Sequence, residues 1–106
     1  SPYAGIRYVD SVVERMGPGQ VNDFLRLYTA PGVDHVGAGA PGNVDMLAAL
    51  ADWVEHGKAP AGLRLVAQET KAPFAVTRAR PLCEWPQWPH YKGGDVNRAE
   101  SFECAK

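Results

Sequence analysis

The sequence has almost no net charge, no long apolar run and only two cysteines. Its 106 residues include 11 Lys and Arg against 12 Asp and Glu, a formal net charge of −1. A near-neutral chain lacks the basic surface that binds nucleic acid or an anionic membrane, which argues against both partners. No apolar run approaches the roughly 20 residues of a membrane-spanning helix. The opening residues lack the charged and apolar regions of a signal peptide, so we expect any targeting peptide to lie upstream of Ser1 or to be missing.

Only two cysteines occur, Cys83 and Cys104, both in a tail rich in proline and tryptophan. A zinc site needs about four closely spaced ligands, and the tail does not supply them. A disulfide, a pair of free thiols and a pair of metal ligands are the alternatives. We favour the disulfide, and with it an oxidising compartment, so we expect a secreted or periplasmic protein.

The length of 106 residues suits either one modest domain or part of a larger one. Two amphipathic helices are expected in it. The first begins with Ser1 as its cap and Pro2 as its first residue, and it ends at Gly17. The second is capped by Asn43 and runs to about His56. Apolar residues recur at helical spacing in both, at Ile6, Val9, Val12, Val13 and Met16 in the first and at Met46, Leu47, Leu50, Trp53 and Val54 in the second.

Three strands are expected around these helices. The run FLRLYTA, residues 24–30, is nearly all apolar and predicts a buried strand in a mostly parallel sheet, although Arg26 fits that position poorly. Residues 63–69 and 74–80 alternate across a short break and predict an antiparallel pair. Prolines and glycines recur in residues 81–106, which predicts an irregular tail of loops. The sequence thus indicates an α/β fold: a helix, a buried strand, a helix, an antiparallel strand pair and a loop tail.

His35 is the main candidate for chemistry. It lies in the glycine-rich loop 31–42, between the predicted strand and the second helix. Loops at the carboxyl ends of strands hold the active sites of open α/β sheets, and a neutral imidazole suits general base catalysis. The alternative is a solvated polar residue. None of the three serines, Ser1, Ser11 and Ser101, stands in a Gly-x-Ser-x-Gly turn, so we expect no complete catalytic triad in these residues.

The remaining candidates have structural explanations that we prefer. His56 lies at a helix end, where a cation is favoured by the helix dipole. His90 has aromatic neighbours, and the wide spacing of the histidines gives little support to a metal site. The aromatic rings of Trp85, Trp88 and Tyr91 have two explanations, stacking on a ligand or anchoring the tail as buried groups.

Residues 23–60 resemble the carboxyl-terminal part of the tannase and feruloyl esterase family. That family has a strand rich in Phe, Arg and Leu, then Pro-Gly-x-x-His-Cys, a glycine-rich loop and a helix ending Trp-Val-Glu-x-Gly-x-Ala-Pro. The tail segments RPLC, YKGGD and SFEC resemble the family's closing segment with its paired cysteines. The matching residues here are Phe24, Arg26, Leu27, Pro31, Gly32, His35, Trp53, Val54, Glu55, Gly57, Ala59 and Pro60.

The resemblance implies an α/β-hydrolase with a Ser-His-Asp triad that cleaves esters of aromatic acids, hydroxybenzoic or hydroxycinnamic. It makes His35 the triad base, with the serine far upstream and the aspartate a few residues before Ser1. Residues 1–106 would then be one segment, the carboxyl-terminal portion of the catalytic domain, inactive alone. Its partner would be the amino-terminal remainder, and without that remainder we expect self-association through uncovered apolar faces. We expect no cofactor in this segment, whereas the family's separate lid domain often carries calcium.

One residue departs from the family pattern. The family usually has a cysteine directly after the histidine, bonded to a cysteine beside the serine, and here that position is Val36. We therefore expect no cysteine beside the serine, and packing or hydrogen bonds in place of the bridge. The competing hypothesis is that the chain is a non-catalytic binding or structural module.

Overall fold

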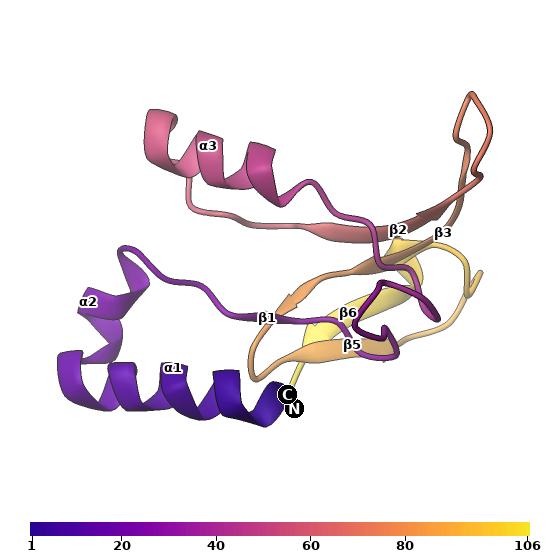
Figure 1. Ribbon diagram of the computed structural model, residues 1–106. Coiled ribbons are helices and arrows are strands. Elements are labelled where there is room, and N and C mark those ends of the chain that lie inside the picture. The colour runs from indigo at the N-terminus through magenta and orange to yellow at the C-terminus, as the bar shows by residue number, and fades with distance from the viewer.

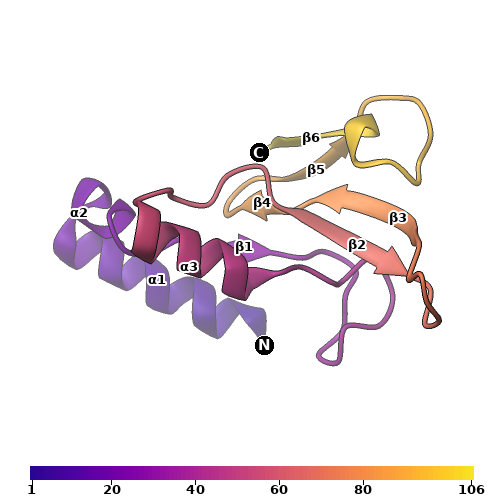
Figure 2. The ribbon, with the colours of Figure 1, turned by 90° about the horizontal axis from the view of Figure 1, so that it is seen from above.

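The computed structural model describes all residues, 1–106, as short helices and three pairs of strands (Figure 1). Both views show the α-helices toward one end of the chain and the longer strand pairs, with the 3₁₀ helix, toward the other (Figures 1 and 2). The elements in chain order are α1 (Pro2–Met16), α2 (Pro18–Asn22), β1 (Tyr28–Thr29), α3 (Met46–His56), β2 (Arg64–Gln68), β3 (Val76–Pro81), β4 (Cys83–Glu84), β5 (Trp88–Tyr91), the 3₁₀ helix η1 (Ala99–Ser101) and β6 (Phe102–Ala105).

Helix α1 begins and ends where the sequence predicts. The Ser1 side chain accepts a hydrogen bond from the Tyr3 N–H, and Pro2 takes the first helical position, where its missing N–H costs nothing. Gly17 ends the helix with φ +88°, a conformation that a side chain would disfavour. Pro18 then starts the five-residue helix α2, which was not predicted from the sequence.

The predicted cap of the second helix is wrong by two residues. The N-cap of α3 is Asp45, whose carboxylate accepts a hydrogen bond from the Ala48 N–H at 2.9 Å. Asn43 instead exchanges both backbone hydrogen bonds with Val66, at 3.0 and 2.9 Å, so its backbone belongs to a bridge with β2. This pairing keeps Asn43 in the bridge with β2, and the helix begins only after Asp45. Gly57 ends α3 in the left-handed conformation, as expected.

The predicted buried strand over residues 24–30 is also wrong in length, burial and pairing. Only β1 is a strand; its residues are half-buried and pair antiparallel with β4. A strand extends only as far as a neighbour offers backbone partners. Here β4 offers two residues before the chain turns at Trp85 and Pro86, and the Trp85 N–H makes one more bond, to the Leu27 carbonyl. All three sheets are two-stranded and antiparallel, so these residues form no parallel sheet among themselves.

The antiparallel pair is confirmed. Strands β2 and β3 pair from Arg64 opposite Pro81 to Gln68 opposite Val76, with an irregularity after Ala67. Leu65, the second residue of β2, is buried. This pair is therefore part of the small core.

The tail is more regular than predicted, because it contains β4, β5, η1 and β6. Trp88–Tyr91 pairs antiparallel with Phe102–Ala105, and Pro89 stands opposite Cys104. A proline is tolerated there because each strand of a two-stranded sheet has an unpaired edge that needs no N–H donor. Cys83 and Cys104 form a disulfide with a Cα–Cα distance of 5.5 Å, which joins β4 to β6.

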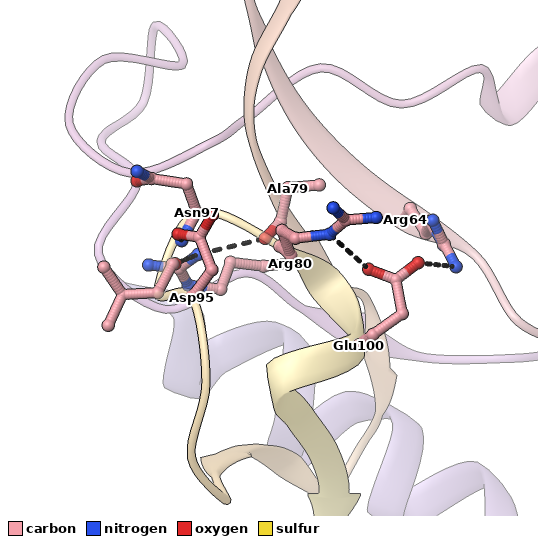
Figure 3. Close-up of polar contacts among 8 residues, drawn as sticks. Arg64, Ala79, Arg80, Asp95, Asn97 and Glu100 are labelled. Atoms are coloured by element: carbon pink, nitrogen blue, oxygen red, sulfur yellow. Dashed lines mark hydrogen bonds and ion pairs between the residues drawn. The ribbon is translucent and has the colours of Figure 1, made fainter.

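An ion pair and a backbone hydrogen bond fasten η1 and the loop before it to the strand pair β2–β3 (Figure 3). Arg64 of β2 lies 2.9 Å from the Glu100 carboxylate, and the Ala79 N–H donates to the Asn97 carbonyl at 2.9 Å. A hydrogen bond from the backbone of Glu100, followed by the contact with Arg64, lowers the pKa of the Glu100 carboxyl. That carboxyl is exposed, so its ion pair with Arg64 contributes little to the stability of the fold.

The core is small, and the apolar face of α3 lies outside it. Figure 1 shows α1 and α3 on opposite sides of the segment that leads from α2 into β1. The buried residues are Ile6, Val21, Pro41, Leu65, Leu82, Cys83, Ala99 and Ser101, and none belongs to α3. On α3, Leu47 is 79% exposed and Val54 77%. None of the helices has both the length and the apolar character to cross a membrane.

We predict that replacing Cys83 and Cys104 together by alanine lowers the free energy of unfolding by about 3 kcal/mol. The bridge closes a loop with a sequence separation of 21 residues, and removing it restores conformational freedom to the unfolded chain. Urea titration followed by tryptophan fluorescence measures the change. Wild type in a thiol reductant is the control and should match the double variant. Identical unfolding midpoints with and without reductant would contradict the bridge.

Candidate active site

His35 lies in the loop between β1 and α3, which projects at the edge of the chain in Figure 2. Its side chain is exposed and makes no hydrogen bond or ion pair with another residue of the chain. The imidazole is therefore free to meet a group that this chain does not contain. His35 therefore remains a candidate base, because no hydrogen bond or ion pair within the chain engages its side chain.

The loop that carries His35 is closed at its base by two glycines. The Ala40 N–H donates to the Gly32 carbonyl at 3.0 Å, and Val33 forms an isolated bridge with Gly39. A Cβ atom on Gly39 would lie 2.4 Å from the Gly32 carbonyl oxygen, and Gly39 has φ +106°. Only glycine fits this approach without moving the backbone. The glycine-rich composition thus serves a specific closure of the loop.

Asp34 fastens the tip of the same loop. One carboxylate oxygen accepts hydrogen bonds from the Val36 N–H at 3.0 Å and from the Ala38 N–H at 2.8 Å. The Asp34 N–H donates to the Ala38 carbonyl at 2.9 Å. This role of Asp34 was not predicted from the sequence, although an aspartate before small residues and glycine is a known turn former.

Val36 does not fasten the loop by packing, because its side chain is 84% exposed. What holds its position is the hydrogen bond from its backbone N–H to Asp34. A further anchor reaches the loop from β3, where the Arg78 guanidinium donates to the Gly39 carbonyl at 3.1 Å. Hydrogen bonds to backbone atoms therefore supply the order of this loop.

The other histidines are engaged elsewhere and lie in separate contacts. His56, in the last turn of α3, lies 3.2 Å from the Asp52 carboxylate. The ring of His90 lies against that of Trp88, with centroids 3.7 Å apart and planes tilted by 35°, and His90 Nε2 lies 3.0 Å from the Ala105 carbonyl oxygen. No group of three or more His, Cys, Asp or Glu side chains is arranged to hold a metal ion.

None of the serines meets His35. Ser1 caps α1, and the Ser11 hydroxyl donates to the Tyr8 carbonyl at 2.6 Å within the same helix. Ser101 is buried in η1, with its oxygen close to Gly94. The three serines therefore have structural positions, and no residue pair of the chain joins a nucleophile to an imidazole.

An aromatic groove of about 610 Å³ adjoins the start of the loop. Its walls include Tyr3, Tyr28, Trp85 and Trp88, and the loop residues 31–33 form one side. Trp88 and Tyr91 are about half-exposed and Trp85 somewhat less, so the expectation that these rings are buried anchors is wrong. Burial, then the charge of Glu84, raises the pKa of Tyr28, whose phenol donates to the Pro60 carbonyl at 3.2 Å.

Comparison with known proteins places this geometry in context. The family model described as tannase and feruloyl esterase matches residues 1–105. A probable feruloyl esterase of Arthroderma benhamiae is 43% identical over 111 residues, covering 99% of this chain and 20% of the relative. The mono(2-hydroxyethyl) terephthalate hydrolase of Piscinibacter sakaiensis is 43% identical over 99 residues, covering 87% of this chain and 16% of that enzyme.

The comparison with solved structures agrees with the comparison of sequences. The crystal structure of an esterase from Aspergillus oryzae matches with a TM-score of 0.80 at 25% identity, covering 95% of this chain and 24% of that one. The chain thus spans about a fifth of the length of its relatives. With the family model matched from residue 1 to residue 105, the chain belongs to the tannase and feruloyl esterase family.

Proposed function

We propose that the chain is the carboxyl-terminal portion of a carboxylic ester hydrolase that acts on esters of aromatic acids, with His35 as its catalytic base. The family match over residues 1–105 carries this proposal. The ordered loop that presents an unengaged imidazole supports the assignment to His35. Two relatives, a probable feruloyl esterase and a mono(2-hydroxyethyl) terephthalate hydrolase, support an aromatic acid in the substrate.

The proposed reaction passes through an acyl-enzyme. His35 takes the proton from a serine hydroxyl outside this chain while the serine oxygen attacks the ester carbonyl carbon. The tetrahedral intermediate collapses, the bond to the alcohol oxygen breaks, and the imidazolium returns its proton to that oxygen. Water then hydrolyses the acyl-enzyme with the same proton transfers, releasing the acid. An aspartate, also outside this chain, would orient the ring.

The aromatic groove beside the loop is compatible with an aromatic substrate. Its tyrosine and tryptophan rings offer faces on which a hydroxybenzoic or hydroxycinnamic ring can stack. The disulfide supports a secreted or periplasmic protein, because such bridges persist in oxidising compartments. Calcium in a lid domain remains an expectation from the family resemblance. The residues of this chain form no site for it, and no step of the reaction is assigned to a metal.

The exposed surface supports the proposal that further chain covers these residues. The accessible surface is 7557 Å² for a mass of 11.5 kDa, whereas a compact monomer of this mass exposes about 5800 Å². The radius of gyration is 15.1 Å, against about 13 Å for a compact domain of this length. The excess includes the apolar face of α3, so the amino-terminal remainder of the protein is its proposed partner.

We predict that His35→Ala in the longer protein lowers kcat at least about a thousandfold, because the serine loses its proton acceptor. Steady-state hydrolysis of methyl ferulate measures the effect. His56→Ala is the matched control, since His56 is exposed and its contact is with Asp52 of the same helix, and it should keep kcat within about threefold. Activity of His35→Ala within about tenfold of wild type contradicts the assignment. Turnover by residues 1–106 alone would contradict an external serine.

A second prediction concerns residues 1–106 by themselves, which should self-associate through the apolar face of α3. Leu47→Glu places a charge on that face and should shift the sedimentation profile toward the monomer. Ala48→Glu is the matched control, because it adds the same charge one residue away without removing a large apolar side chain. A monomeric wild type at high concentration, or equal responses to the two substitutions, would refute the prediction.

A further inference from the structure

We infer that Asp34 is a positioning residue for His35, acting through the loop backbone and without contact with the ring. This inference rests on the proposed function, in which His35 is the base. The observation that supports it is that one carboxylate oxygen of Asp34 accepts hydrogen bonds from the Val36 N–H, at 3.0 Å, and from the Ala38 N–H, at 2.8 Å. The carboxylate therefore spans the residue that carries the imidazole.

Backbone hydrogen bonds complete the turn around His35. The Asp34 N–H donates to the Ala38 carbonyl at 2.9 Å, and the Gly37 N–H donates to the Asp34 carbonyl at 3.2 Å. Together with the side-chain bonds, these contacts close residues 34–38 into one turn, with Gly37 at φ +85°. The direction in which the Cα–Cβ bond of His35 leaves the backbone is then set by this turn.

The side chain of His35 adds nothing to its own placement within the chain. It makes no hydrogen bond there, and the neighbouring Val36 side chain is exposed and does not pack. A base must hold its nitrogen within hydrogen-bond reach of the proton it takes, and a misplacement of about 1 Å can cost about a hundredfold in rate. The order of the turn is thus a requirement for the proposed chemistry, and Asp34 supplies it.

The contacts of Asp34 also distinguish it from the aspartate of a catalytic triad. A triad carboxylate accepts a hydrogen bond from the imidazole, whereas the hydrogen bonds of the Asp34 carboxylate come from backbone N–H groups. We therefore expect the side chain of residue 34 to act through the two hydrogen bonds that it accepts and not through its negative charge. Asparagine, whose amide oxygen accepts the same two bonds, should replace Asp34, whereas alanine should not.

The test uses the longer protein and measures the loop and the reaction separately. In Asp34→Ala, peptides covering residues 32–40 should exchange their amide hydrogens about tenfold faster, because two N–H groups lose their acceptor. In the same variant kcat should fall about 10- to 100-fold with KM within about threefold. Asp34→Asn should keep both properties near wild type.

Asp95→Ala is the matched control. Asp95 is also exposed, and its carboxylate accepts the Asn97 N–H at 2.9 Å in a loop between β5 and η1. Its loss should speed exchange only in its own loop and leave kcat unchanged. Equal losses of kcat in the Asp95 and Asp34 alanine variants would indicate general destabilisation and overturn the inference.

The outcomes separate this inference from the proposed function. Unchanged exchange over residues 32–40 in Asp34→Ala overturns the inference, because the carboxylate would not hold the loop. Faster exchange with unchanged kcat also overturns it, provided that His35→Ala is inactive. Loss of activity in Asp34→Asn would mean that charge acts, again against the inference. An active His35→Ala variant overturns the proposed function first, and the positioning role falls with it even if the exchange data stand.

Discussion

The disulfide between Cys83 and Cys104 is the constraint on which the rest of the structure depends. Cys83 is only 1% exposed and lies in β4, which pairs with β1, while Cys104 lies in β6, which pairs with β5. The residue before Cys83 donates its N–H to the Leu63 carbonyl at the start of the β2–β3 pair. One short segment therefore connects all three sheets. Because a pair of strands is marginal by itself, this covalent link replaces cohesion that the small core does not supply.

The sequence predicted those features that depend on local chemistry. The Ser1 cap, the Gly17 and Gly57 ends and the pairing of β2 with β3 followed from capping residues and from alternation of apolar and polar residues. The errors concern competition for partners. Asn43 is a residue type that can cap a helix, but its backbone pairs with that of Val66. The apolar run that ends in β1 finds only the two residues of β4 as strand partners. Such competition depends on which segments meet in space, and local composition does not contain it.

The site shows the same division. A loop histidine after an apolar run was identifiable from the sequence, and its family resemblance gave it a role. The contacts that order the loop were not predicted, because they depend on how the backbone of residues 34–38 turns and on which other segment lies beside it. Arg78, which donates to Gly39, lies 39 residues away along the chain. Neither spacing nor composition predicts a hydrogen bond between segments that distant.

The loop and the scaffold also differ in what holds them, and the difference bears on function. Leu65 and Cys83 are held by burial, whereas the His35 loop is exposed and held by hydrogen bonds to its backbone, from within the loop and from Arg78 of β3. A loop ordered in this way needs little from the core, so its geometry can persist while the apolar face of α3 is uncovered. It also leaves the imidazole unengaged. Within these residues the loop backbone sets the placement of His35, and under the proposed function the nucleophile and the group that orients the ring come from elsewhere in the protein.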